Sequence, residues 1–296
     1  MIELRASESD GDLEAWASVK SAVVPNQPVT AEQLRASDEE GRLLLLAEAD
    51  GEPVGCGIAA PSHFNGLAFA AARVLPGHRR RGIGTAIAAA LIDHARALGR
   101  DGLSAFVDAA EPASMAFVER YGLSEVDHEL EQRRVLGNEP AAAVPDGLEL
   151  VAVADRRDEL LRAVWPIAQQ GYADMPLPGV ISYTLDEWLR EEATIAAGSF
   201  VALERGAPVG YAGLLTHAEI GCAHHGLTVV RRDRRRRGIA IALKRAQLNW
   251  AAQNGLSELV TWTQRGNEAM QALNRRLGYA DTSRSITFQG PLPSSG

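Results

Sequence analysis

The alternation of apolar and polar positions predicts the same series of elements twice along the chain. Apolar residues at every second position predict strands, and apolar residues three and four apart predict helices. The first half has predicted strands at 2–5, 42–48, 54–60, 67–74 and 103–107, and predicted helices at 12–24, 31–37, 81–98 and 112–121. The second half has predicted strands at 148–151, 200–203, 209–215, 227–230, 259–263 and 285–288, and predicted helices at 158–170, 185–196, 237–254 and 268–277. This mixed order indicates two copies of one α/β domain.

The limits of the two copies are marked by turn residues and by a change in composition. Asp50-Gly51 is a strong turn pair between two predicted strands, so these strands form a hairpin. Residues 137–147 are rich in Pro, Gly and small side chains, which predicts a linker. We therefore expect an N-terminal domain at 1–136 and a C-terminal domain at 148–290.

A motif of arginine and glycine recurs at one fixed spacing. Arg79 and Arg235 are 156 residues apart (235 − 79), and so are Gly82 and Gly238 (238 − 82). Each copy stands between a predicted strand and a predicted helix. A match at one domain-sized offset across both halves predicts a tandem duplication.

Glycine and arginine at a strand-to-helix junction are suited to bind phosphate. Backbone N–H groups at a helix start have no partner within the helix and carry the positive end of its dipole. Glycine or alanine lets a pyrophosphate approach these groups, while arginine side chains add counter-charge. A Rossmann site is the competing interpretation, but no G-x-G-x-x-G follows the first predicted strand. Neither copy has the Gly-Lys-Ser/Thr of a P-loop.

Composition narrows the class of protein. The 296 residues, 46% of them hydrophobic, are enough for two domains that each bury a core. The net charge of −8 argues against broad nucleic-acid affinity, although residues 231–237 include six arginines. We interpret that run as a contact to cofactor phosphate, because it lies at the strand-to-helix junction.

Cysteine content and hydropathy favour a cytoplasmic protein. No apolar run has the length that spans a membrane. Cys56 and Cys222 are the only cysteines, and neither stands in a CxxC or Cys/His metal-ligand pattern. We therefore expect no metal, no membrane and no nucleic acid among the ligands and partners, and buried, inert thiols in a reducing compartment.

These motifs resemble the GNAT superfamily of acetyl-CoA-dependent N-acyltransferases. The resemblance rests on the series strand, V-x-P-x-x-R-x-x-G-x-G, helix, strand, and a last helix that stops at Gly122 or Gly278. It covers both halves and is similar to the two-domain layout of mycothiol synthases within the family. It implies a mixed sheet that splays open at its middle, with acetyl-CoA as co-substrate and its pantetheine arm in the splay.

The resemblance also implies which residues contact acetyl-CoA. In the second half they are Val230, Arg231, Arg235, Arg236, Arg237, Gly238, Ile239, Ala240, Ile241 and Asn267. In the first half they are Val74, Leu75, Arg79, Arg80, Arg81, Gly82, Ile83, Gly84 and Thr85.

Both halves depart from the family at one catalytic position. Many members have a tyrosine four residues before the closing glycine of the last helix, where it protonates the leaving thiolate. Val118 and Asn274 occupy this position here. Asn274 can hydrogen-bond the thioester sulfur, but it has no acidic proton to donate. We interpret the first half as cofactor-binding at most and expect the second half to be catalytic.

Attack by an amine on a thioester needs a general base, because a protonated amine has no free lone pair. Glu219 and His225 lie close to the second cofactor strand, where the family often keeps a carboxylate or a water-binding residue. We predict His225, Glu219 and Asn274 as catalytic residues, with solvated loop side chains as the alternative for the first two. Tyr172 and Asp174, ahead of the next helix, are candidates for contact with the acceptor.

Two functions remain open from the sequence. The first is transfer of an acetyl group from acetyl-CoA to a small-molecule or peptide amine, by direct attack in a ternary complex of a monomer or homodimer. A covalent acyl-enzyme is not expected, since neither cysteine has the neighbouring partner that a thiolate nucleophile needs. The second is a non-catalytic acyl-CoA-binding or regulatory protein, in which the missing tyrosines mark lost chemistry.

Overall fold

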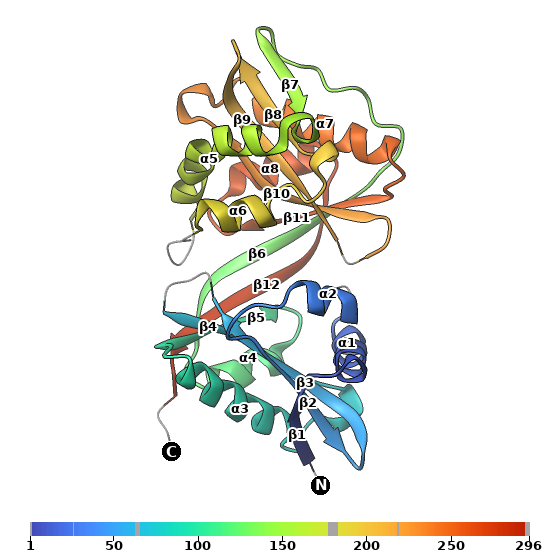
Figure 1. Cartoon of the computed structure of the whole chain (residues 1–296), viewed down its shortest axis with the longest axis vertical. Coiled ribbons are helices and arrows are strands. Elements are labelled where there is room, and N and C mark those ends of the chain that lie inside the picture. Colours follow the sequence, from blue (N-terminus) through green and yellow to red (C-terminus); the bar gives the residue numbers. More distant parts are fainter. Residues whose placement is uncertain (1, 26, 63–65, 177–182, 218, 294–296) are drawn as a thin grey trace. The chain divides into compact units, whose positions relative to one another are not determined.

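The computed structural model of the chain divides into two compact units (Figure 1). Unit 1 comprises Met1–Asp127 and Ser285–Gly296, and unit 2 comprises His128–Arg284. The residues described are 2–25, 27–62, 66–176, 183–217 and 219–293. Each unit therefore contains residues of both sequence repeats.

Unit 1 is a mixed sheet with the strand order β1-β2-β3-β4-β5-β12, in which β4 and β5 run parallel. Its strands are β1 (Ile2–Ala6), β2 (Leu43–Ala49), β3 (Glu52–Pro61), β4 (Leu67–Val74), β5 (Gly102–Asp108) and the part of β12 (Ala280–Pro291) from Ser285. Its helices are α1 (Asp10–Val23), α2 (Ala31–Ala36), α3 (Ile83–Ala97) and α4 (Pro112–Glu119).

Unit 2 repeats this plan with the strand order β6-β11-β10-β9-β8-β7, in which β10 and β11 run parallel. Its strands are β7 (Leu148–Ala152), β8 (Phe200–Glu204), β9 (Ala207–Thr216), β10 (Cys222–Val230), β11 (Glu258–Gln264) and the part of β6 (Ser124–Val135) from His128. Its helices are α5 (Arg157–Asp174), α6 (Leu185–Glu191), α7 (Ile239–Gln253) and α8 (Glu268–Arg276).

Helices cover both faces of each sheet because the buried strands are apolar on both faces. In β2, Leu44 and Leu46 pack against α1 and α2, while Leu45 and Ala47 pack against α3. Successive side chains of a strand point to opposite faces, so four consecutive apolar residues serve two cores. Capping boxes begin α1, α2 and α6, each with a Ser or Thr whose side chain accepts a backbone N–H of the first turn.

The two sequence repeats exchange their last strands. The last strand of the first repeat, β6, completes the sheet of unit 2, and the last strand of the second repeat, β12, completes the sheet of unit 1. Residues Ser285–Pro291 of β12 pair antiparallel with β5 of unit 1, and residues Glu129–Val135 of β6 pair antiparallel with β11 of unit 2. The unit boundaries therefore fall inside β6 and β12, which differs from the contiguous ranges 1–136 and 148–290. The exchange supplies the backbone hydrogen-bond partners that β5 and β11 need along one edge.

The predicted series of strands and helices is present, but β10 begins at Cys222 and not at 227, β12 spans Ala280–Pro291 and not 285–288, and two elements differ further. The strand β6 has no predicted counterpart, because it alternates charged residues with few apolar ones. The helix predicted at 185–196 ends at Glu191 and is followed by a 3₁₀ turn at Ala196–Gly198. Among the residues that the structure describes, no helix combines the length and apolarity needed to cross a bilayer.

The exchanged strand makes a stability prediction. Phe288 of β12 is 2% exposed and packs in unit 1 with residues of β5 such as Leu103. We expect Phe288→Ala to cost about 3–5 kcal/mol by loss of buried area and creation of a cavity. In hydrogen exchange, amide protection should fall across unit 1 and stay unchanged in β10 of unit 2. Arg284→Ala, at an exposed position of the same strand, is the matched control, and equal loss in both units contradicts the assignment.

Candidate functional site

The sheet of each unit opens between its two parallel strands. In unit 2, β10 and β11 pair from Cys222↔Glu258 to His224↔Val260, and the pairing ends there although both strands continue. In unit 1, β4 and β5 pair from Leu67↔Gly102 to Phe69↔Ser104 and then separate in the same way. The splay implied by the family resemblance is thus present in both units, and it leaves strand backbone free to bind an extended ligand.

A left-handed glycine begins the helix that follows the splayed strand. Gly238 has φ +80° and precedes α7, and Gly82 has φ +83° and precedes α3. A β-carbon at Gly82 would meet no atom within 4 Å, so the space over the helix start is open. The first turn of each helix has no side-chain cap, so its backbone N–H groups have no side-chain partner at the helix start. Both junctions therefore have the form of an anion cradle.

The first arginine of each motif has the same contact in both units. Arg235 Nε donates to the carbonyl oxygen of Val230 at 3.0 Å, and Arg79 Nε donates to that of Val74 at 3.2 Å. This bond closes the loop between strand and helix. The residue two positions before the helix cap also matches, since Arg80 and Arg236 both have positive φ, at 64° and 62°. The two cradles share one backbone geometry.

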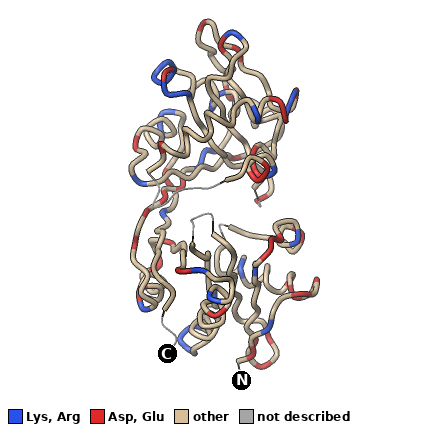
Figure 2. Tube along the Cα trace, turned by 60° about the vertical axis from the view of Figure 1, so that its left-hand side comes forward, with Lys and Arg blue, Asp and Glu red and all other residues tan. Residues whose placement is uncertain are grey.

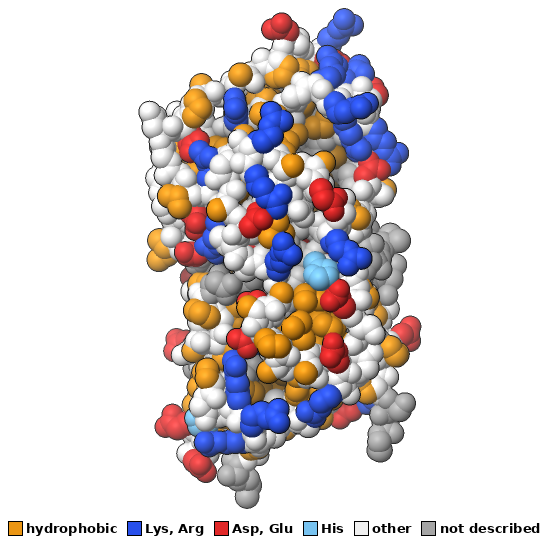
Figure 3. All heavy atoms as spheres, turned by 180° about the vertical axis from the view of Figure 1, so that it is seen from behind, with side chains coloured by type: hydrophobic (Ala, Val, Ile, Leu, Met, Phe, Trp, Pro, Cys, Tyr) orange, Lys and Arg blue, Asp and Glu red, His pale blue; other side chains and the backbone are white. Residues whose placement is uncertain are grey.

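Several arginines beside the unit 2 cradle are paired with carboxylates. Asp174, in the last turn of α5, accepts hydrogen bonds from Arg232 and Arg235, which hold its pKa down at about 2. Glu204 accepts from Arg234 at 2.7 Å and from Arg237 at 3.0 Å. Figure 2 shows acidic residues on the trace near many of the basic ones, and Figure 3 shows a group of Lys and Arg side chains at the upper right with a few Asp and Glu beside it. Five of the six arginines are thus paired, but with only three carboxylates, Asp174, Glu204 and Asp233, so the run keeps a net positive charge.

A β-bulge distinguishes the splayed strand of unit 2 from that of unit 1. The pairing of β10 with β9 shifts register between His225 and Thr228. The pairing of β4 with β3 runs from Gly55↔Val74 to Pro61↔Ala68 without a shift. The bulge turns both Gly226 and Leu227 towards the face that α5 and α6 cover. Bulges of this kind re-aim side chains and backbone groups at functional sites.

Glu192 is a buried carboxylate that lies against this bulge. Its side chain accepts the hydroxyl of Tyr211 at 2.9 Å and the backbone N–H groups of Ala193 and Leu227. The residue is 6% exposed, and burial raises the pKa of its carboxyl to about 7, against the opposing effect of these hydrogen bonds. A carboxyl that titrates near neutrality beside an open sheet is suited to accept a proton.

Glycines of the neighbouring strands make room for this carboxylate. A β-carbon at Gly213 of β9 would lie 1.8 Å from Glu192 Oε1, and one at Gly226 of β10 would lie 2.4 Å from it. Sequence reasoning missed Glu192. A signal was present, because Leu185, Trp188 and Glu192 follow helical spacing and place the acid on the apolar stripe of α6.

His225 faces the opposite side of the sheet and is fully engaged. Its Nδ1 lies 2.9 Å from Gln247 Oε1 of α7, and its Nε2 contacts the hydroxyl of Tyr279. Burial first, and then the charge of Lys244, hold the pKa of His225 far below its usual value. A ring with both nitrogens bonded and a low proton affinity is a structural element of this core. The structure therefore does not favour His225 as the base.

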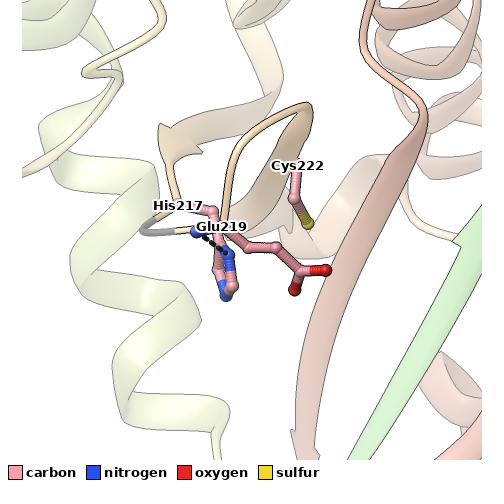
Figure 4. A group of neighbouring side chains, drawn as sticks. All are labelled: His217, Glu219 and Cys222. Carbon is pink, nitrogen blue, oxygen red and sulfur yellow. Dashed lines mark hydrogen bonds between the residues drawn. The ribbon is translucent and has the colours of Figure 1, made fainter. Parts of the chain in front are cut away.

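Glu219 lies in a cluster with His217 and Cys222 at the start of β10 (Figure 4). Their ligand atoms lie within 4.8 Å of one another. The set does not fit a metal ion, because the guanidinium of Arg133 binds the Glu219 carboxylate at 3.1 Å and His217 Nδ1 accepts the N–H of Glu219. Burial raises the pKa of the Cys222 thiol to about 12, which opposes the thiolate that a metal needs.

Asn274 and Asn267 lie on α8, at different depths. Asn274 is 0% exposed and donates to Gln132 Oε1 of β6 at 2.9 Å, while its Oδ1 is buried without a hydrogen-bond partner. No part of this side chain reaches a substrate in this conformation. Asn267 precedes the first residue of α8, caps no backbone group with its side chain and keeps part of its surface exposed. Of the two, Asn267 is the one available to a ligand.

Comparison with known proteins agrees with this geometry. The acetyltransferase (GNAT) family matches residues 12–123 and 160–279. The chain is similar to a mycothiol acetyltransferase of Nocardia farcinica, with 29% identity over 292 residues that cover 94% of this chain and 91% of the relative.

Two solved structures share the fold of the whole chain. The GCN5-related N-acetyltransferase of Sphaerobacter thermophilus superposes with a TM-score of 0.81 at 20% identity, covering 100% of this chain and 97% of that one. A tandem GNAT protein from the clavulanic acid biosynthesis pathway gives 0.81 at 22% identity, covering 100% of both chains. With the family matched over both halves, the chain belongs to the GNAT acetyltransferase family and is an N-acetyltransferase.

Proposed function

We propose that the C-terminal half transfers an acetyl group from acetyl-CoA to the primary amine of a small molecule. The observation that carries this proposal is the combination, in unit 2, of an open splay, a bulged strand and a buried carboxyl with a pKa of about 7. The relatives named mycothiol acetyltransferase support a small-molecule acceptor over a peptide.

The acetyl-CoA site follows from the cradle and the splay. The pyrophosphate binds the N–H groups of residues 235–241 at the start of α7, where Gly238 allows close approach. The pantetheine arm extends along β10 from Val230 into the splay, where strand backbone offers hydrogen bonds to its amides. Residues 79–85 form a second cradle with the same backbone geometry in the first half.

The position of the carboxylate supports catalysis in the second half. Glu192 stands at the C-cap of α6, and Ser37 stands at the C-cap of α2, 155 residues earlier (192 − 37). The first half therefore has a hydroxyl where the second has an ionisable acid. It also has no register shift in β4 within its described pairing. Two features of the proposed chemistry are thus confined to unit 2.

In the proposed reaction, the ammonium of the acceptor gives a proton to Glu192, directly or through one water. The free amine attacks the thioester carbonyl, and the carbon–nitrogen bond forms. The carbon–sulfur bond then breaks to release the thiolate of CoA, and the second proton lost by the amine nitrogen passes to this thiolate, directly or through water. Backbone N–H groups of the splayed part of β10 stabilise the oxyanion of the intermediate. Transfer is direct, since both cysteines are buried and burial raises the pKa of each thiol to about 12.

The cradle can be tested with one substitution in each half. Gly238→Glu places a β-carbon at φ +80° and a carboxylate in the phosphate site, so it should abolish the thermal shift that CoA produces in unit 2 and most of the turnover. Gly82→Glu is the matched control, because Gly82 has nearly the same φ, and it should affect turnover much less. An equal or reversed effect on turnover moves the active site to the first half.

The base can be tested by its pH profile. With acetyl-CoA and a panel of primary amines, kcat/KM of the wild type should fall as pH drops below about 7, when Glu192 becomes protonated. Glu192→Gln should lower kcat/KM by about 10²-fold or more and abolish this acidic limb. Glu191→Gln changes the exposed neighbouring carboxylate and should retain both rate and profile. An unchanged acidic limb in Glu192→Gln rejects the assignment, and CoA binding without turnover in the wild type rejects the transferase.

The same carboxyl makes folding stability depend on pH. Between about pH 4.5 and pH 7 the unfolded chain releases this proton while the folded protein keeps it, so the free energy of unfolding falls as pH rises. Glu192→Gln lacks this term. The stability of the variant relative to the wild type should therefore rise by up to about 3 kcal/mol from pH 5 to pH 8. Urea unfolding at both pH values measures this, and a constant difference contradicts a raised pKa.

A further inference from the structure

Unit 1 contains two basic side chains that lie together without an acidic partner. Arg73 belongs to β4 and stands opposite Cys56 of β3 in the sheet register. Lys20 lies in the last turn of α1, the helix that covers this face. Among the residues that the structure describes, no Asp or Glu is close enough to affect the pKa of either side chain. The pair is therefore a local excess of positive charge.

The surroundings of the pair disfavour this charge. Arg73 Nη1 is buried and has no hydrogen-bond partner. Burial lowers the pKa of Arg73, and burial followed by the charge of Arg73 lowers the pKa of Lys20 to about 8. Cys56 supplies no counter-charge, because burial raises the pKa of its thiol to about 12. Unpaired buried charge is costly to the folded state, and a bound anion would remove that cost.

Other arginines of unit 1 have their charge balanced by a carboxylate. Arg5 binds the carboxylates of Asp12 and Glu48, and Arg42 binds Asp38 at 2.9 Å. Arg73 departs from this pattern although it is on a central strand. Arg73 and Lys20 are each only partly buried as whole residues, so the pair is not sealed completely from solvent.

The place of Arg73 on its strand makes it accessible to a ligand in the splay. The pairing of β4 with β5 ends at Phe69↔Ser104, so Arg73 lies on the part of β4 that has separated from β5. Six residues later the chain reaches Arg79 and the cradle. The pair thus lies on the open segment of the strand, on its α1 face.

The second half has an apolar contact at the equivalent place. Val229 is 156 residues after Arg73 (229 − 73) and is 5% exposed in the core beneath α5. Lys20 lies four residues before the C-cap of α1, and Gly171 lies four residues before the C-cap of α5. A β-carbon on Gly171 would lie 2.7 Å from Val229 Cγ2, so these two residues pack closely. Two cations in the first half correspond to a tight apolar contact in the second.

We propose that the N-terminal half has a binding site for a small oxyanion ligand, a carboxylate or a phosphate, held by Arg73 and Lys20. The guanidinium offers two parallel N–H donors to two oxygens, and the ammonium adds a point charge and further donors. This site is distinct from the cradle at residues 79–85 and does not depend on the acetyl transfer assigned to the second half.

Thermal unfolding at constant ionic strength tests the site. The background carries Gly82→Glu and Gly238→Glu, which block phosphate at both cradles. Replacing chloride by inorganic phosphate or by succinate should raise the Tm of unit 1 by about 3 °C or more, and the anion with the larger shift identifies the ligand class. Arg73→Met and, separately, Lys20→Met in this background should lose the shift.

The controls separate a site from a general salt effect. Arg190→Met removes an exposed arginine of α6 in unit 2 and should keep the full shift. In chloride, Arg73→Met should be at least as stable as its parent, because it removes an unpaired buried charge. Equal shifts in Arg73→Met, Lys20→Met and the control overturn the proposal, and so does a parent protein that shows no shift with either anion.

Discussion

The rest of each unit depends on one constraint, which is that its two parallel strands pair over only three residues, β4 with β5 in unit 1 and β10 with β11 in unit 2. A fully paired sheet would satisfy the backbone of β4, β5, β10 and β11 internally and would leave no opening. In unit 2 the register ends at His224↔Val260, and β10 continues for six residues beyond it. The strand that leaves its partner also leads into the glycine-capped helix. The opening for an extended ligand and the cradle for its phosphates are therefore consequences of one feature of the backbone.

The exchanged strands follow from the same constraint. Because β5 and β11 separate from their parallel partners, most of their backbone must be satisfied on the other edge. The antiparallel strands β12 and β6 do this over seven residue pairs each. Phe288 and Ile286 then bring apolar side chains into the core of unit 1. Strand exchange and splay are thus linked. The antiparallel pairing with β12 or β6 supplies the backbone hydrogen bonds that β5 and β11 lose where they separate from β4 and β10.

Much of the fold was predictable because its signals are local. Apolar alternation marks the strands, and the left-handed positions at Gly82 and Gly238 fall on the glycines of the repeated motif. Strand exchange was not predictable, since the residues of β12 do not specify β5 as the strand with which they pair. The role of Glu192 was not predicted, for a similar reason. Its burial depends on Gly213 and Gly226, which lie on two other strands and come together only in the fold.

The histidine prediction shows the limit of reasoning from residue type. A histidine just ahead of the predicted cofactor strand suggests a base, but the structure places His225 within β10, where the β-bulge and the pleat decide which face it occupies. His225 points to α7 and is held by Gln247, whereas the positions after it turn towards α5 and α6. One extra residue in β10 therefore places the imidazole of His225 on one face and the neighbours of Glu192, our proposed base, on the other.

The duplication shows how one backbone acquires two roles. Both halves keep the splay, the left-handed glycine and the arginine bond to the strand carbonyl, because each is fixed by main-chain geometry. The differences lie in side chains at equivalent places, where Glu192 corresponds to Ser37 and Val229 to Arg73. In the functions that we propose, these exchanges reverse the charge of the ligand that each opening favours. A carboxylate against the bulge favours a cationic amine, while a guanidinium on the unbulged strand favours an anion. After duplication, the halves could therefore diverge in what they bind without altering the backbone that binds it.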